Sequence, residues 1–175
     1  MIKIAVLFAD GTEEIEALTP VDVLKRAGVE CEIVSVSGKN PTGSHNIKIL
    51  PDRVIENVDL AGYDGVVIPG GMPGAVNIAN SKKVVDGIKN IKKTGKLIAA
   101  ICASPAVVLA AGGVIDGEKL TCYPAERFVE EIKKHGEYLP EEVVECGNII
   151  TANGPKSAMA FSLKICRYLG VTPKF

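Results

Sequence analysis

The chain has 175 residues, enough for one domain with a core that needs no disulfide staples. Hydrophobic residues make up 47% and aromatic residues 5% of it, with no Trp, which predicts an aliphatic core of the kind found around buried parallel sheets. Twenty Lys and Arg against 21 Asp and Glu leave a net charge of −1, which argues against partners such as nucleic acid or an anionic membrane.

The cysteines and the apolar stretches indicate a soluble, reduced, cytoplasmic protein. There are five cysteines, an odd number, and the start at Met1 shows no secretory leader. Residues 97–115 contain no charged side chain, but Pro105 and the pair Gly112 and Gly113 interrupt this apolar stretch. We therefore expect a buried strand followed by a buried helix there, and no membrane span.

Strand-like and helix-like patterns alternate along the chain. In chain order we expect a strand at 2–8, a helix at 13–27, strands at 30–36, 47–50 and 65–68, a helix at 81–94, a strand at 96–101, a helix from about 105, a strand at 120–123, a helix at 125–135, a hairpin at 143–146 and 148–152, and a helix at 158–169. Repeated strand–helix units imply a mostly parallel sheet with helices on both faces, in one domain spanning residues 1–175.

Cys102 lies where the strand at 96–101 gives way to the helix that begins near Pro105. Free backbone N–H groups at a helix start favour an anion and lower the pKa of a thiol, which would make Cys102 a nucleophile or a redox sensor. The alternative is a small, buried, inert thiol. Ser104 precedes proline, so it is expected outside helical dihedrals.

Three unusual segments fall at the carboxyl ends of strands, where ligands bind in folds of this kind. They are residues 10–16, residues 69–74 and the turn at Cys102. Glu16 is the candidate to point inward, while Glu13 and Glu14 are expected to be solvated in the first turn of their helix. A buried Glu16 beside a thiol would have a raised pKa, stay protonated and donate a hydrogen bond.

The glycine-rich loop at residues 69–74 has two candidate uses. Its backbone N–H groups could hold an oxyanion or form a nest for phosphate. Its spacing matches neither standard phosphate-binding glycine pattern, which favours the oxyanion, and an ordinary glycine-rich turn is the third reading.

With these segments in view, the chain resembles the DJ-1/PfpI superfamily. The matching pieces are residues 11–16, 20–28, 69–71, 99–105 and 151–155. The resemblance implies a flavodoxin-like three-layer sandwich related to class I glutamine amidotransferase domains, a homodimer, and no metal or other cofactor.

The resemblance also implies roles for individual residues. Cys102 matches the reactive cysteine of a strained nucleophile elbow, and Glu16 matches the protonated glutamate that contacts it. The backbone at Gly70, Gly71 and Ala103 matches a site that resembles an oxyanion hole.

Two departures from the family pattern narrow the function. PfpI-type proteases carry a histidine directly after the nucleophile, where this chain has Ala103, which counts against an intracellular protease. DJ-1 proteins have a histidine near the cysteine, and Tyr123 stands at that position. Glu16 is then the only local proton acceptor for Cys102.

His45 and Cys122 are candidate auxiliary residues. His45 falls where relatives carry an arginine that reaches the neighbouring subunit's site, so we hypothesise that it acts across a dimer interface; the alternative is an exposed loop histidine. Cys122 is expected to end a strand at the same sheet edge as Cys102, where it could resolve a disulfide, or it could simply fill the core.

Two classes of function follow for a thiol of this kind. One is a cofactor-independent glyoxalase or deglycase acting on small reactive carbonyls or glycated adducts. The other is a cysteine-oxidation sensor or redox-regulated chaperone in stress protection.

Overall fold

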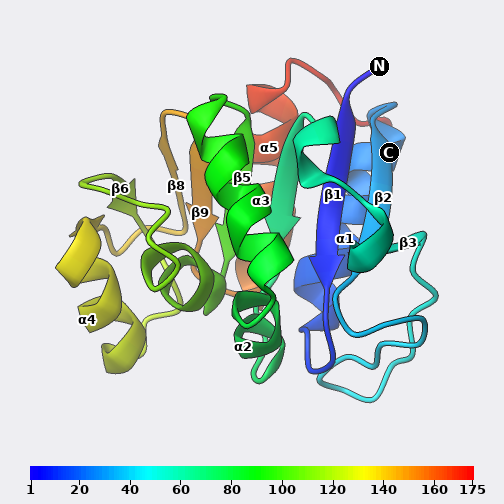
Figure 1. Ribbon diagram of the computed structural model, residues 1–175. Coiled ribbons are helices and arrows are strands. Elements are labelled where there is room, and N and C mark those ends of the chain that lie inside the picture. The colour runs from blue at the N-terminus through cyan, green and yellow to red at the C-terminus, as the bar shows by residue number, and fades with distance from the viewer.

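A seven-stranded sheet lies between two layers of helices in the computed structural model, which describes residues 1–175 (Figure 1). The strands in spatial order are β3 (Arg53–Val54), β2 (Glu30–Ser35), β1 (Lys3–Phe8), β4 (Gly65–Ile68), β5 (Leu97–Ile101), β9 (Ile149–Ala152) and β8 (Val143–Cys146). All neighbours pair in parallel except β8, which forms an antiparallel hairpin with β9. The expected flavodoxin-like α/β fold is confirmed.

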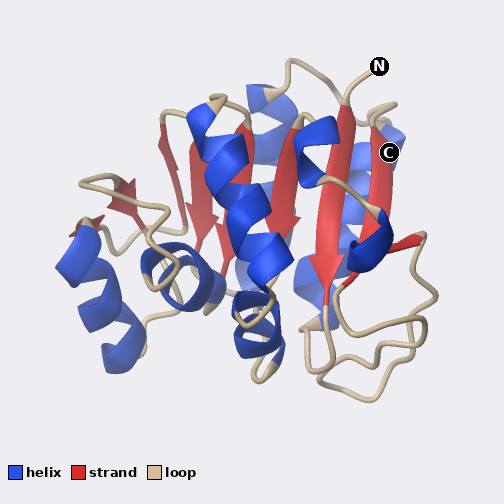
Figure 2. Cartoon of the chain, in the orientation of Figure 1, coloured by secondary structure: helices blue, strands red, loops and turns tan.

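Helices cover both faces of this sheet, as Figure 2 shows. They are α1 (Glu14–Arg26), α2 (Gly74–Ala79), α3 (Lys82–Lys93), α4 (Glu126–His135) and α5 (Ala158–Tyr168), with short helical turns η1 (Ile55–Asn57), η2 (Leu60–Gly62), η3 (Pro105–Ala110) and η4 (Pro155–Ser157). Helices α1 and α5 pack together on one face, and α2, α3 and η3 cover the other. None of these helices combines the length and apolar character required to cross a bilayer.

The core is divided into two layers by the alternating sides of the strands. In β1, Ala5 and Leu7 belong to the layer beneath α2 and α3, while Ile4, Val6 and Phe8 belong to the layer beneath α1 and α5. All five side chains are fully buried. A strand buried on both faces reads as a continuous apolar run, which is why β1 could be recognised from the sequence.

The strand order places the functional segments together. The chain builds outward from β1 to β2 and β3, then returns to the other side of β1 with β4 and β5. The order therefore reverses between β1 and β4, and the carboxyl ends of β1, β4 and β5 lie side by side. This reversal is where ligands bind in open α/β sheets.

Two expectations about local structure are wrong, and one helix was missed. Residues 47–50 form no strand, and only an isolated bridge joins Thr42 to Lys48. Because no neighbouring sheet covers this apolar run, Leu50 is 87% exposed. The strand expected at 120–123 shortens to β6 (Lys119–Leu120), which pairs with β7 (Glu137–Tyr138) in a separate two-stranded sheet. Helix α2 was not expected because it begins with a glycine and has no side-chain cap.

Candidate functional site

Cys102 occupies a sharp turn at the end of β5. Its N–H donates to the Ala152 carbonyl on β9 at 2.9 Å, and its carbonyl accepts from the Tyr123 N–H at 2.8 Å. The backbone has φ +64°, a left-handed conformation that costs free energy for a residue with a Cβ. This geometry, followed directly by the π-helical turn η3, lifts the thiol out of the strand as in a nucleophile elbow.

Glu16 reaches this thiol from the first turns of α1. Its side chain is fully buried, and Oε2 accepts the Gly70 N–H at 2.8 Å. The carboxyl group also lies close enough to the Cys102 thiol for each group to shift the pKa of the other. Its second oxygen, Oε1, has no nitrogen or oxygen partner in the chain, so it is free to hold a proton. The structure therefore brings together the two residues that the sequence singled out.

Gly70 makes this close approach possible. A Cβ at that position would lie 2.7 Å from the Cβ of Cys102 and 2.7 Å from Oε2 of Glu16. Gly71 is equally constrained, since it has φ +89° and a Cβ there would lie 2.4 Å from the Glu13 nitrogen. A side chain at either glycine would push apart the segments that meet at the site.

The pKa values of the pair follow from burial. Desolvation raises the pKa of Glu16 to about 7. Desolvation, the Glu16 charge and the hydrogen bond to Glu16 raise the pKa of the Cys102 thiol to about 12, although the N–H groups of Ala103 and Gly71 act in the opposite direction. The net shift is therefore opposite to the one expected from the helix start alone, because burial and the neighbouring carboxylate outweigh the backbone donors. A thiolate forms here when Glu16 carries the proton.

Glu14 is buried, which contradicts the expectation that it is solvated. It is 4% exposed, its Oε1 accepts the His45 N–H at 2.8 Å, and its Oε2 lies 2.8 Å from Nδ1 of His45 and 3.2 Å from Oγ of Ser44. Gly43 permits this approach, since a Cβ there would lie 2.2 Å from Oε1 of Glu14. Burial raises the pKa of Glu14, but the hydrogen bonds from His45 and Ser44 outweigh it, so the net direction is downward.

His45 is consequently tied to α1 of its own chain. Its side chain is 69% exposed, and the hydrogen bond to Glu14 raises its pKa above 6.5. Its ring nitrogen and the carboxylates of Glu13 and Glu14 offer three ligand atoms within 4.8 Å of one another. The sequence did not reveal this cluster because its members come from segments about 30 residues apart. Glu14 is already satisfied by hydrogen bonds within the chain, so we assign no metal to it.

Tyr123 contacts Cys102 through its backbone, whereas no hydrogen bond joins Cys122 to Cys102. The Tyr123 N–H holds the Cys102 carbonyl, while its side chain is 46% exposed. Cys122 does not end a strand of the main sheet as expected. It is fully buried, its thiol donates to the Tyr123 carbonyl at 3.4 Å, and burial raises its pKa to about 12. This environment fits a core residue better than a resolving thiol.

Neither histidine hydrogen-bonds Cys102. His45 binds Glu14, and His135 lies 3.2 Å from a carboxylate oxygen of Glu131 at the end of α4. Within the chain, the thiol is therefore paired with a carboxyl group and backbone N–H donors, and the Cys–His pair of a protease is missing.

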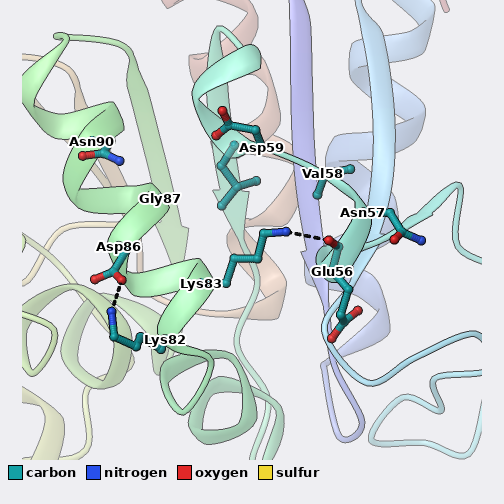
Figure 3. Close-up of a pocket in the computed structure, with 10 residues that line it drawn as sticks. Glu56, Asn57, Val58, Asp59, Lys82, Lys83, Asp86, Gly87 and Asn90 are labelled. Carbon is teal, nitrogen blue, oxygen red and sulfur yellow. Dashed lines mark hydrogen bonds and ion pairs between the residues drawn. The ribbon is translucent and has the colours of Figure 1, made fainter.

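A large surface cavity lies elsewhere, between η1 and α3 (Figure 3). It has a volume of about 780 Å³, and only two of its ten lining residues, Val58 and Leu60, are hydrophobic. Its two lysines are engaged within the chain: Lys82 pairs with Asp86, and Lys83 donates to the Glu56 carbonyl at 2.7 Å. These groups are satisfied without a ligand.

Comparison with known proteins identifies the family to which this chain is similar. A model of the DJ-1/PfpI family matches residues 2–168. The chain is 38% identical over 166 residues to protein dj-1beta of Drosophila melanogaster, covering 94% of this chain and 87% of that protein. It is 37% identical over 166 residues to the Parkinson disease protein 7 homolog of Danio rerio, with the same coverage. Among solved structures, oxidized Toxoplasma gondii DJ-1 superposes with a TM-score of 0.89 at 40% identity, covering 97% of this chain and 91% of that one.

Proposed function

The chain belongs to the DJ-1/PfpI family, and on that premise we propose that it acts on small reactive carbonyls or their adducts through Cys102, without a cofactor. The observation that supports this most directly is the buried contact between the Glu16 carboxyl and the Cys102 thiol. One group is a nucleophile, and the other takes and returns its proton.

The chemistry begins with addition of the thiol to an α-oxoaldehyde. The thiol proton passes to Glu16, the sulfur forms a bond to the aldehyde carbon, and the carbonyl electron pair moves onto oxygen. The N–H groups of Gly71 and Ala103, which already face the sulfur, are placed to hold this oxyanion. Glu16 then returns the proton to oxygen and a hemithioacetal results. A proton then moves from the former aldehyde carbon to the neighbouring carbon through an enediol, which gives a 2-hydroxy thioester. One water cleaves the carbon–sulfur bond of this thioester, which releases a 2-hydroxy acid and restores the thiol.

Methylglyoxal turnover tests this proposal. The purified protein should form lactate, and Cys102→Ser should reduce the rate at least about 100-fold, because removing a covalent nucleophile removes the pathway. Cys146→Ser is the matched control, since Cys146 is the other partly exposed cysteine, and it should retain the rate. A wild-type rate equal to that of Cys102→Ser would exclude the activity.

A second candidate function, an oxidation sensor, is favoured by the free Oε1 of Glu16. Peroxide converts a thiolate to sulfenate and then to sulfinate, each step transferring one oxygen and releasing water. A protonated Oε1 and the N–H groups of Gly71 and Ala103 would supply three donors to a sulfinate. The oxidized state of the Toxoplasma gondii relative is consistent with such a role.

Peroxide titration with mass spectrometry separates this candidate from the first. Cys102 should gain two oxygen atoms before Cys146 is modified. Oxidation of other cysteines while Cys102 stays unmodified would exclude a sensor.

We further propose a cytoplasmic homodimer, the assembly common among DJ-1 proteins. In this dimer His45, although bound to Glu14 of its own chain, would lie close to the neighbouring site. Sedimentation analysis tests the dimer, and a His45→Gln variant with an unchanged pH dependence of Cys102 alkylation would exclude the role of His45. A chaperone activity is compatible with the sensor; a PfpI-type protease is disfavoured by the missing Cys–His pair.

A further inference from the structure

One peptide group links the two segments that carry the acid and the thiol. It is the peptide between Pro69 and Gly70, at the end of β4. Its N–H, from Gly70, donates to Oε2 of Glu16 at 2.8 Å. Its carbonyl, from Pro69, accepts from Oγ of Ser104 at 2.6 Å. A residue of the nucleophile turn therefore holds one end of this peptide and the buried acid holds the other.

The hydroxyl of Ser104 is the only donor that reaches this carbonyl. Pro69 is buried, and its oxygen has no backbone or other side-chain partner. Ser104 is itself fully buried. It also adopts φ −66° and ψ −32°, helical values that a residue before proline usually avoids, so the sequence-based expectation was wrong. The surrounding structure holds Ser104 in place, and the hydrogen bond to Pro69 is part of that restraint.

The orientation of this peptide sets two donors of the site. The first is the Gly70 N–H to Glu16. The second is in the next peptide, where the Gly70 carbonyl accepts the Glu13 N–H at 3.0 Å and the Gly71 N–H faces the sulfur of Cys102. A rotation of the Pro69–Gly70 peptide would turn the Gly70 N–H away from Glu16, and it would strain the adjoining peptide, whose N–H faces the sulfur.

We propose that Ser104 is a positioning residue, whose hydroxyl fixes the Pro69–Gly70 peptide so that one N–H meets Glu16 and the next meets the sulfur of Cys102. The proposal deepens the proposed function, on which it rests, because it concerns how the same acid–thiol pair is tuned. The hydroxyl of Ser104 itself hydrogen-bonds neither the carboxyl nor the thiol.

Loss of the Ser104 hydroxyl shifts the first apparent pKa of the pair in the same direction whether the remaining proton is on Glu16 or on Cys102. When the first proton leaves, the negative charge lies on Glu16, stabilised by the Gly70 N–H, or on Cys102, stabilised by the Gly71 N–H. Loss of the Ser104 hydroxyl leaves a buried carbonyl unpaired and weakens both donors. The first apparent pKa of the pair therefore rises in either case.

The test is the pH profile of Cys102 alkylation by iodoacetamide, with the modified site assigned by mass spectrometry. Ser104→Ala and Ser104→Gly should raise the midpoint by about one pH unit, which is a tenfold loss of thiolate at a fixed pH below it. Ser104→Thr, which keeps the hydroxyl, should restore the midpoint. Ser162→Ala is the matched control: Ser162 is also fully buried and donates to a backbone carbonyl, that of Ala158, at 2.7 Å in α5. It should leave the midpoint unchanged.

Three results would overturn the proposal. One is an unchanged midpoint in folded Ser104→Ala or Ser104→Gly. Another is an equal shift in Ser162→Ala, which would assign the effect to a general loss of packing. The third is failure of both deletion variants to fold, which would assign the hydroxyl to the fold as a whole. Alkylation needs no carbonyl turnover, so an absent glyoxalase activity with a shifted midpoint would reject the proposed substrate and leave the role of Ser104 standing.

Discussion

Replacing Glu16 with glutamine should make the protein more stable at neutral pH, and the gain should vanish in acid. Glutamine has nearly the same shape, and its Oε1 can still accept the Gly70 N–H that Oε2 of Glu16 accepts at 2.8 Å. The substitution removes the ionisation of a carboxyl group that is fully buried. It also places an amide NH2 group where Oε1 lay, but the effect of that group does not change with pH, so the pH dependence reports the ionisation.

The size of the effect comes from the raised pKa. Burial raises the pKa of Glu16 from 4.5 to about 7 in the folded protein. Below pH 4.5 the carboxyl is protonated in both the folded and the unfolded chain, so it has no effect on stability. Between pH 4.5 and 7 the unfolded chain releases the proton and the folded chain keeps it, so the free energy of unfolding falls as pH rises. At 1.36 kcal/mol per unit, the loss by pH 7.5 is about 3 kcal/mol.

Urea denaturation at several pH values between 4 and 8 measures this effect. The quantity to follow is the free energy of unfolding of Glu16→Gln minus that of the wild type, because the ionisable groups that do not interact with Glu16 cancel in the difference. The difference should rise by about 3 kcal/mol between pH 4.5 and 7.5. Glu130→Gln, at an exposed position of α4 where the carboxylate pairs with Lys133, is the control for exchanging a carboxyl for an amide, and the change in its difference should be much smaller than that of Glu16→Gln. A flat difference for Glu16→Gln would refute the conclusion that burial controls this carboxyl group.

Two further predictions concern the surroundings of the pair. Gly71→Ala should lower the free energy of unfolding by about 3 kcal/mol, measured by thermal or urea unfolding, because the new Cβ would lie 2.4 Å from the Glu13 nitrogen. Gly95→Ala is the control: Gly95 also has a positive φ but has open space around it, so this variant should lose only about 1 kcal/mol. Equal losses in the two variants would contradict the close packing at Gly71. The pKa of His45, measured by NMR titration, should lie above 6.5 in the wild type and return toward 6.5 in Glu14→Gln, since the hydrogen bond to Glu14 raises it; no change in that variant would show that the contact does not form in solution.

Local patterns in the sequence were sufficient to predict those strands and helices whose burial leaves a regular pattern of apolar residues. The continuous apolar run that became β1 and the helix that became α3 were recognised nearly to their ends, because burial on two faces or on one helical face leaves a regular signature. The same reasoning failed at residues 47–50. An apolar run indicates a strand only if a sheet accepts it, and here no such neighbour is present.

The candidate site shows the same division. Residue type and position were sufficient to name Cys102, at the end of β5, and Glu16, in the helix that follows β1. The burial of Glu14 could not, because it depends on a loop about 30 residues further along the chain that folds back onto α1. The direction of the Cys102 pKa could not either, since desolvation and the facing carboxylate depend on the whole packed structure.

The sequence by itself thus determined the α/β alternation, the turn at Cys102 and the glycines that allow segments to approach. Those are short-range properties of residues and their immediate neighbours. Only the tertiary structure decided that the acid, the thiol and the Pro69–Gly70 peptide form one hydrogen-bonded unit. The reason is physical: solvent exclusion and hydrogen-bond geometry arise when distant segments pack, and they set the energy of each charge at the site.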